Sequence, residues 1–232
     1  MGRGSMPAPV SIIIPALNGE NDLPACLESL LPGLAGGLIR EVLLVDAGSE
    51  DRTCEIAEAA GCRIMQAERG RAKQLIAGAG AARGDWLLFL HADTALSPEW
   101  AERAGAHIET SPGKAATFEL AFRSDAREAK WLAARANRRT RWFALPYGDQ
   151  GLLISRQLYD ALGGYADIPL MEDVALARAI GRRRLRLLSA TARTSAAKYE
   201  RDGWRRRAYR NAFLVMRYLL GASPEKLARS YD

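Results

Sequence analysis

Carboxylates that follow apolar runs are the side chains best placed for chemistry in this sequence. Asp46 directly follows the run Glu41–Val45, and Asp93 comes three residues after the run Trp86–Leu90. A carboxylate at a strand end can accept a hydrogen bond from a base imide N–H or a ribose hydroxyl. It can also bind a divalent cation, because Mg²⁺ is usually held by one or two carboxylates together with phosphates and waters. The structural alternatives are helix capping after Asp46 and an Asp-Thr turn at Asp93.

Two further charged clusters open predicted helices. Arg69-Gly-Arg71-Ala-Lys73 combines cations with the free N–H groups of a helix start, which suits phosphate. Met171-Glu172-Asp173 puts two carboxylates at another helix start, where one can act as the general base on an acceptor hydroxyl. The alternative is that these carboxylates merely stabilise the helix dipole. Asp149, in Gly148-Asp-Gln-Gly151, is a further loop carboxylate, with an ordinary turn as its alternative.

Several catalytic signatures are absent from the sequence. It has neither a Walker pattern nor a G-x-G-x-x-G turn after the first strand, which disfavours a P-loop NTPase and a Rossmann dehydrogenase. It has no G-x-S-x-G elbow, so hydrolysis by a nucleophilic triad is not expected. Gly78 and Gly80 fall inside a predicted helix and are expected to permit close packing. Three cysteines at non-metal spacings are expected to be reduced thiols, which favours a cytoplasmic protein.

The elements that must position these groups alternate regularly in the first 95 residues. Strands are predicted at 10–14, 41–45, 62–66 and 86–90, and helices at 21–31, 51–60 and 69–83. The strands are continuously apolar, which is typical of a parallel, doubly wound sheet with helices on both faces. Ligands of such sheets bind beyond the carboxyl ends of the strands. Polar groups follow all four predicted strands, at Asn18, Asp46, Glu68–Arg71 and His91–Asp93.

The second half of the chain is less regular. Helices are predicted at 97–110 (with Ser97 as the cap), 126–139, 172–181, 201–220 and 224–230, and strands at 115–123, 151–155, 185–188 and 191–194. With no repeat or linker, residues 7–232 are expected to form one α/β domain. Its parts are a nucleotide-binding half (7–95), an acceptor and catalytic half (96–200) and a helical C-terminal extension (201–232). Residues 1–6 resemble an expression scar or a native tail and are left out.

Charge is distributed unevenly along the 232 residues. Residues 1–120 carry a net charge of −6 and residues 121–232 one of +12. A basic half suits an anionic partner such as phosphate or a membrane surface, whereas nucleic acid is not expected because no aromatic motif is interleaved with the cations. No apolar run is long enough to span a membrane, so any membrane contact must be peripheral.

The predicted helix at 204–220 carries five arginines and a broad apolar stretch. One face is expected to be buried, and its members are Trp204, Ala208, Asn211 or Ala212, Val215, Tyr218 and Leu219. The helix either rests on an anionic membrane, at the inner face and near a lipid-linked acceptor, or packs on the core or on a second subunit of a homo-oligomer.

Taken together, these segments resemble a family-2 glycosyltransferase of the GT-A type. The resemblance rests on Val10–Asn18, Val45–Thr53, Ala81–Thr94 and Glu172-Asp173, which occur in the family's order. The segment Tyr199–Trp204 resembles a bacterial subgroup, the radical-SAM/selenodomain-associated transferases.

The resemblance implies a role for each candidate residue. Pro15, Ala16, Leu17 and Asn18 would border the nucleotide, Asp46 would recognise the base (commonly uracil), and Arg71 would lie near the diphosphate. Asp93 matches the second Asp of the Asp-x-Asp metal motif, which implies Mg²⁺ or Mn²⁺ as the cofactor. Asp173, with Glu172 beside it, matches the catalytic base. Asp149 and Gln150 would lie in the acceptor region.

Three departures from the family's pattern affect the metal and the donor. His91 stands where the family has the first Asp, so Asp93 is expected to be the direct metal ligand. Gly19 replaces the Glu that usually follows Asn18, and Ile76 stands where many relatives have Asn.

The predicted function is that of an inverting glycosyltransferase, which moves a sugar from a nucleoside-diphosphate sugar to an unknown hydroxyl acceptor. One alternative is a nucleotidyltransferase, although its glycine-rich loop after the first strand is missing. Another is a non-catalytic nucleotide- or anion-binding protein on the same fold.

Overall fold

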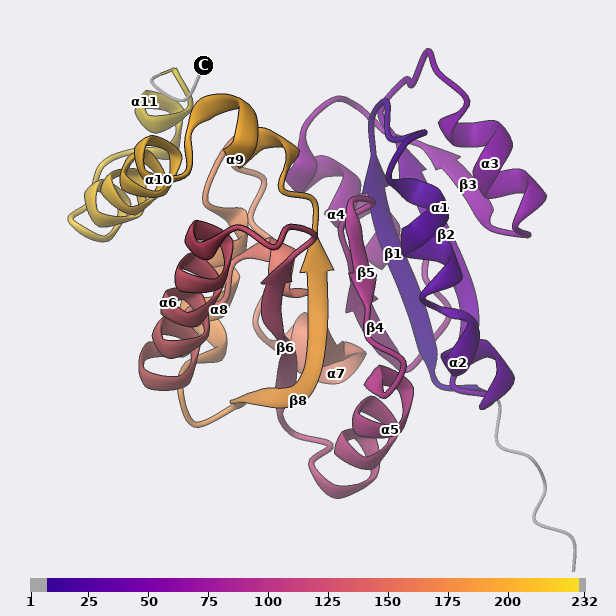
Figure 1. The fold of residues 1–232 in the computed structure, drawn as a ribbon. Coiled ribbons are helices and arrows are strands. Elements are labelled where there is room, and N and C mark those ends of the chain that lie inside the picture. Colours follow the sequence, from indigo (N-terminus) through magenta and orange to yellow (C-terminus); the bar gives the residue numbers. More distant parts are fainter. Residues whose placement is uncertain (1–7, 230–232) are drawn as a thin grey trace, which may run out of the picture.

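The computed structural model describes residues 8–229, so the predicted tail at 1–6 lies outside the described residues. Its centre is one eight-stranded sheet in the order β3-β2-β1-β4-β7-β6-β8-β5 (Figure 1). The strands are β1 (Val10–Ala16), β2 (Ile39–Asp46), β3 (Arg63–Gln66), β4 (Trp86–Phe89), β5 (Thr94–Leu96), β6 (Ala115–Phe122), β7 (Leu152–Ser155) and β8 (Leu185–Thr194). Strands β3, β2, β1 and β4 are parallel, as are β6 and β8, whereas β7 and β5 run antiparallel to their neighbours. The predicted α/β class with a mostly parallel sheet is confirmed.

Helices cover both faces of this sheet. They are α1 (Leu23–Glu28), α2 (Leu31–Ala35), α3 (Thr53–Ala59), α4 (Arg71–Ala81), α5 (Trp100–Thr110), α6 (Arg127–Phe143), α7 (Arg156–Ala161), α8 (Glu172–Ile180), α9 (Ala197–Asp202), α10 (Trp204–Leu219) and α11 (Pro224–Ala228). Successive side chains of a strand point to opposite faces. Ile12 therefore packs in one core with Trp100 of α5, and Ile13 packs in another with Leu75 of α4. A Cβ at Gly78 would lie 2.4 Å from Ile13 Cγ2, so Gly78 permits close packing, while Gly80 has no such neighbour.

Four predicted elements are divided or joined differently in the structure. The helix at 21–31 is two short helices, because Pro32 has no N–H with which to continue α1. The strands at 185–188 and 191–194 are one strand, β8, interrupted by an irregularity opposite Phe118 and Glu119. The helix at 201–220 breaks at Gly203, whose φ of 84° favours glycine.

The predicted cap Ser97 is wrong. The N-cap of α5 is Glu99, and Ser97 Oγ instead accepts a hydrogen bond from the Thr191 backbone N–H at 2.8 Å. The reason is β5, a three-residue strand that the sequence analysis missed, which pairs with β8 and places Ser97 beside that strand. The analysis also missed the short helix α7.

The C-terminal helices α10 and α11 pack beside α6 and the α8 region, on the side of the molecule formed by the second half of the chain (Figure 1). Leu214 of α10 forms a small apolar cluster with Met171 and Val174 of the α8 region and with Leu227 of α11. The predicted buried face of α10 is partly wrong, because Ala212 and Leu219 are exposed while Arg207 is buried. Arg207 can be buried because its Nη1 pairs with Asp202 Oδ2 at 2.6 Å. Among the helices in residues 8–229, none combines the length and the apolar character that crossing a membrane requires.

Candidate active site

The loops that follow β1 and β2 are joined by hydrogen bonds. The Asn18 backbone N–H donates to Ser49 Oγ at 2.9 Å, and the Glu50 N–H donates to Asn18 Oδ1 at 2.9 Å. The Gly19 N–H donates to Thr53 Oγ1 at 2.7 Å. The predicted nucleotide-binding residues Pro15, Ala16, Leu17 and Asn18 therefore lie at the same edge of the sheet as Asp46. Leu17 is 45% exposed.

Asp46 is buried at the end of β2, and its carboxylate accepts hydrogen bonds from the turn that follows it. Its Oδ2 accepts hydrogen bonds from the Gly48 and Ser49 backbone N–H groups at 2.9 and 3.0 Å, and its Oδ1 accepts one from Ser49 Oγ at 2.5 Å. Burial acts to raise the pKa of Asp46, but these hydrogen bonds from Ser49 and Gly48 outweigh it and hold the pKa below its ordinary value. Asp46 is therefore an ionised acceptor, whose Oδ1 retains lone-pair capacity.

Gln74 is a structural residue of this edge that the sequence analysis missed. Its Nε2 donates to the backbone carbonyls of Ala16 and Val45 at 2.8 and 2.7 Å, and the side chain is buried. Gln74 thereby fixes the ends of β1 and β2 against α4. The signal in the sequence is a single amide on the otherwise apolar buried face of that helix.

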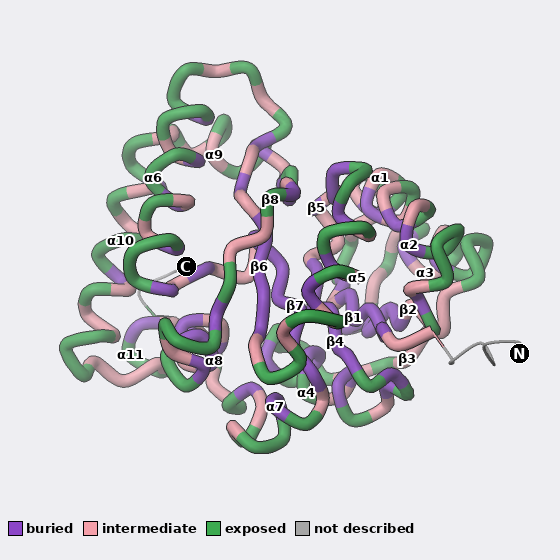
Figure 2. Tube along the Cα trace, turned by 90° about the horizontal axis from the view of Figure 1, so that it is seen from below, coloured by how far each residue is buried: buried purple, intermediate pink, exposed green. Residues whose placement is uncertain are grey.

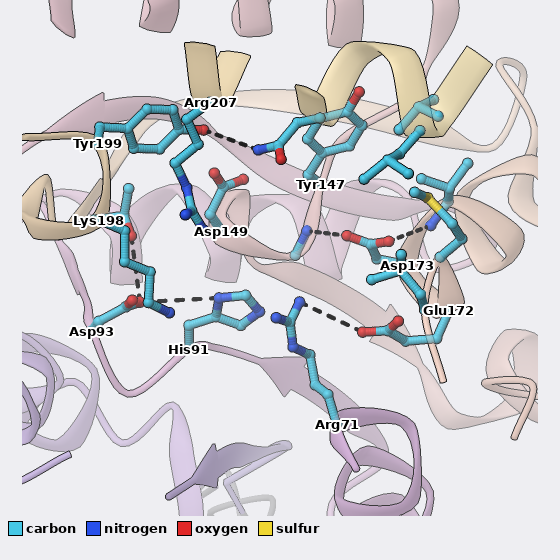
Figure 3. A pocket seen from close by; sticks show the side chains of 18 of the residues that line it. Arg71, His91, Asp93, Tyr147, Asp149, Glu172, Asp173, Lys198, Tyr199 and Arg207 are labelled. Carbon is cyan, nitrogen blue, oxygen red and sulfur yellow. Dashed lines mark hydrogen bonds and ion pairs between the residues drawn. The ribbon is translucent and has the colours of Figure 1, made fainter. Parts of the chain in front are cut away.

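A second group of polar residues surrounds a cavity of about 170 Å³ (Figure 3). Its walls come from the N-terminus of α4, the segment after β4, the turn η1 (Gly148–Gln150), the start of α8, and helices α9 and α10. The predicted residues in these walls are Arg71, Asp93, Asp149, Glu172 and Asp173. Segments distant in sequence thus bring the predicted diphosphate, metal and base residues into one cavity. Gln150 is not among its walls.

The side chains of His91 and Asp93, both in the segment after β4, lie close to each other. His91 Nδ1 lies 4.0 Å from Asp93 Oδ1, and that oxygen accepts two long hydrogen bonds, of 3.3 Å, from Thr94 and Thr194. Burial and, second, the positive charge of Arg71 lower the pKa of His91 to about 4. The imidazole is therefore neutral at pH 7 and keeps a lone pair for a ligand.

Gly148 connects His91 to Asp173. Its backbone N–H donates to Asp173 Oδ2 at 2.8 Å, and the Val174 N–H donates to Asp173 Oδ1 at 2.7 Å. A Cβ at position 148 would lie 2.6 Å from His91 Nε2, so only glycine allows this approach. Two backbone donors therefore hold the Asp173 carboxylate in one orientation at the cavity wall.

Glu172 lies deeper than Asp173 and is 3% exposed. Its Oε1 is 3.6 Å from Arg71 Nη1, an ion pair too long for a hydrogen bond. Burial and then the charge of Asp173 raise the pKa of Glu172 to about 7. The residue before it, Met171, has a left-handed backbone with φ of 73°, which is unusual for a side chain of its size.

The two predicted acceptor residues have different surroundings. Asp149 lines the cavity, and burial raises its pKa to about 6. Gln150 is fully buried, accepts a hydrogen bond from Thr140 Oγ1 at 2.8 Å and donates one to the Phe118 carbonyl at 3.0 Å. Gln150 therefore anchors the η1 turn to the core through its side-chain hydrogen bonds.

The cavity also contains residues that the sequence analysis did not assign. Lys198, Tyr199 and Arg207 come from α9 and α10, and Tyr147 precedes the η1 turn with the Arg139 guanidinium 3.4 Å from its ring centre. Nothing in the order of residues indicates that the C-terminal helices return to the carboxyl edge of the sheet.

The residues present fit a divalent cation that is held largely by its substrate. Within residues 8–229, no three His, Cys, Asp or Glu side chains gather closely enough to bind a metal by themselves. The Asp93 carboxylate and the neutral His91 imidazole can supply two ligands, and phosphates and waters usually complete such a shell.

Comparisons with known proteins identify relatives of this chain. A PGL/p-HBAD biosynthesis glycosyltransferase of Mycobacterium tuberculosis is 41% identical over 99 residues, which cover 39% of this chain and 38% of that relative. S. aureus TarS 1–349, solved with UDP-GlcNAc, superposes with a TM-score of 0.62 at 18% identity, covering 81% of this chain and 58% of TarS.

A second solved structure has the same fold. Glucosyl-3-phosphoglycerate synthase from Mycobacterium tuberculosis, solved with Mn²⁺, UDP and glucosyl-3-phosphoglycerate, superposes with a TM-score of 0.56 at 21% identity, covering 81% of this chain and 70% of the synthase. At these identities the two superpositions establish the GT-A fold. Residues 11–166, more than half of the chain, match the model of glycosyl transferase family 2, and the chain belongs to that family.

Proposed function

We propose that the protein is an inverting glycosyltransferase that uses a nucleoside-diphosphate sugar, with UDP as the nucleotide, and a hydroxyl acceptor. The observation that carries the proposal is the single cavity in which Arg71, the His91–Asp93 pair and Asp173 meet. The presence of UDP-GlcNAc or UDP in solved structures of the same fold supports the choice of nucleotide.

The donor is proposed to lie along the carboxyl edge of the sheet. The joined loops at Pro15–Asn18 and Asp46 border the nucleoside, and Arg71 at the start of α4 faces the diphosphate. A Mg²⁺ or Mn²⁺ ion held by Asp93, with His91 beside it, supplies charge neutralisation for the leaving diphosphate. Cations and helix N–H groups at the same place favour the same anion.

The acceptor is proposed to approach from the Asp173 side. The Asp173 carboxylate removes the proton of the acceptor hydroxyl while its oxygen attacks the anomeric carbon from the face opposite the diphosphate. The Gly148 and Val174 N–H groups keep the carboxylate oriented for that transfer. The sugar bond to the nucleotide breaks as the new one forms, which inverts the configuration.

Membership of a glycosyltransferase family weighs against the nucleotidyltransferase alternative. An assay of sugar hydrolysis and transfer with several nucleotide sugars distinguishes the non-catalytic alternative. A binding protein neither hydrolyses nor transfers the sugar of any of them.

The donor site gives a direct prediction. UDP with Mn²⁺ is expected to raise the melting temperature of the wild-type protein by mass action, and Asp46→Ala is expected to weaken UDP binding by about tenfold, because it removes a buried base or ribose acceptor. Titration calorimetry with UDP, ADP and GDP measures this. Glu58→Ala, which removes an exposed carboxylate on α3, is the control. Unchanged UDP affinity in Asp46→Ala would contradict the role of Asp46.

Several broader assignments are part of the same proposal. Residues 7–232 act as one domain, with nucleotide (7–95), acceptor (96–200) and C-terminal helical (201–232) parts. Position 7 and positions 230–232 lie outside the described residues. The protein works in the cytoplasm, with a homo-oligomer as a further prediction. The segment Tyr199–Trp204 carries the assignment to the radical-SAM/selenodomain-associated subgroup.

A peripheral membrane contact through 204–220 is the second prediction. Tyr209, Phe213, Met216 and Leu220 are exposed on α10, next to Arg217. Apolar side chains with neighbouring cations favour an anionic lipid surface. The protein is expected to sediment with vesicles containing phosphatidylglycerol at low salt and to be released at high salt.

The double variant Phe213→Ser/Leu220→Ser is expected to stay in the supernatant. Pure phosphatidylcholine vesicles serve as the control. Absence of vesicle binding by the wild type, together with insolubility after deletion of 204–232, would assign the helix to core or subunit packing instead.

A further inference from the structure

A groove lies between α6 and α10, next to the cavity just described. It has a volume of about 270 Å³. Its apolar walls include Trp131 and Leu132 of α6, Phe122 of β6, and Ala208 and Ala212 of α10. Trp131 is 49% exposed, so the groove opens to solvent on this side of the molecule, where α6 and α10 lie side by side (Figure 2).

The groove is continuous with the catalytic cavity. Tyr147, Asp149, Tyr199 and Asn211 line both spaces. Figure 3 shows Tyr147, Asp149 and Tyr199 on the same side of the cavity. A molecule in the groove can therefore reach the cavity wall that Asp173 also lines.

Two hydrogen-bond acceptors at this junction have no partner within the described part of the chain. They are Asp149 Oδ1 and Asn211 Oδ1, and both atoms are buried. Asn211 is oriented by its Nδ2, which donates to the Tyr199 hydroxyl at 3.4 Å. Buried polar atoms in native proteins are normally hydrogen-bonded, so this pair suits a ligand that brings hydroxyl donors.

The walls around the junction are held in place. The Arg139 guanidinium stacks on Tyr147, and its Nε donates to the Leu145 carbonyl at 2.7 Å. Tyr199 stacks on Trp204, with ring centres 5.2 Å apart. The aromatic side chains therefore form a preformed surface, which is typical of ligand pockets with few convergent polar groups.

We propose that this groove binds the apolar body of the acceptor, whose hydroxyl reaches the junction at Asp149 and Asn211. The acceptor is then an alcohol on an aryl or hydrocarbon body, and not a free polyol. This assignment rests on the proposed function and names the substrate class of its acceptor side. Continuity with the catalytic cavity and the two unpartnered acceptors favour this occupant over a second copy of the chain.

The experiment compares binding of 4-hexylphenol and glycerol by titration calorimetry, with UDP and Mn²⁺ present. Ala212→Trp fills the groove from an exposed position of α10, and Ala212 itself is not among the residues that line the catalytic cavity. Ala134→Trp makes the same change at an exposed position of α6 outside the groove, so it is the matched control. Trp131→Ala removes an exposed wall and is the second test.

Wild type is expected to bind 4-hexylphenol and not glycerol. Ala212→Trp is expected to weaken that binding by about tenfold or more, since an apolar contact of this size is lost, and Trp131→Ala by several-fold. Ala134→Trp is expected to behave as wild type, and UDP affinity is expected to be equal in all four proteins.

Three results would overturn the assignment. They are equal binding of glycerol and 4-hexylphenol, 4-hexylphenol binding that neither groove variant changes, and a wild-type dimer that Ala212→Trp dissociates. If the wild type binds 4-hexylphenol but neither binds UDP nor transfers sugar, the proposed function is contradicted. The groove then remains an apolar binding site.

Discussion

Replacing Asp173 with Asn is expected to lower turnover by about a hundredfold or more, the usual scale for removal of a general base. The amide is nearly the same size as the carboxylate but cannot take up the acceptor proton at neutral pH. The single amide oxygen of the new Asn can still accept a hydrogen bond from the Gly148 or the Val174 N–H, so the start of α8 is expected to keep its fold. UDP affinity, measured by calorimetry, is expected to survive because Asp173 is proposed to face the acceptor and not the nucleotide.

The neighbouring carboxylates provide the controls for this variant. Glu172→Gln removes the ion pair with Arg71, whose atoms are 3.6 Å apart, and is expected to cost less activity than Asp173→Asn. Asp149→Asn tests the half-buried carboxylate at the groove junction. If Glu172→Gln is the inactive protein and Asp173→Asn retains turnover, the base is one residue earlier than proposed.

The second large effect is expected at Asp93. Asp93→Ala is expected to abolish metal-dependent turnover, because the variant loses the carboxylate that is proposed to bind the metal ion and that lies 4.0 Å from His91. The fold is expected to persist, since the lost hydrogen bonds from Thr94 and Thr194 are long, at 3.3 Å. The measurements are sugar transfer against Mn²⁺ concentration and the circular dichroism of both proteins.

His91 supplies a graded comparison for the metal. His91→Gln removes an imidazole nitrogen while Asp93 stays, so a higher Mn²⁺ requirement with retained turnover is expected. Full activity of Asp93→Ala, or wild-type activity that EDTA leaves untouched, refutes the metal role.

Much of the nucleotide half was predictable because its elements follow one another in both sequence and space. Continuous apolar runs identify β1, β2 and β4, and the polar residues after them gather at one edge because the strands are parallel. The places of Asp46, Arg71 and Asp93 at this edge could therefore be predicted from the sequence, whereas the roles proposed for them come from the family resemblance.

The second half was less predictable, because its contacts join segments far apart in the chain. The short strand β5 forms because it pairs with β8, about a hundred residues later in the chain. The family resemblance places Gln150 in the acceptor region. In the structure its side-chain amide is instead buried and forms hydrogen bonds with Thr140 and with the Phe118 carbonyl. Arg207 was not part of the predicted buried face of its helix, yet its ion pair with Asp202 lets it be buried.

Met171 has a consequence for how the protein fails on heating. A left-handed backbone at a non-glycine residue costs about 1–3 kcal/mol and persists only while its surroundings enforce it. Those surroundings include Val174 of α8 and, from the last two helices, Leu214 and Leu227, in a cluster much smaller than the cores under the sheet. Parts of a protein with few buried contacts open before the whole unfolds. Warming is therefore expected to release α10 and α11 first, and with them the backbone that presents Asp173. Sugar transfer is then expected to be lost at temperatures where the sheet and the loops after β1 and β2 are still folded.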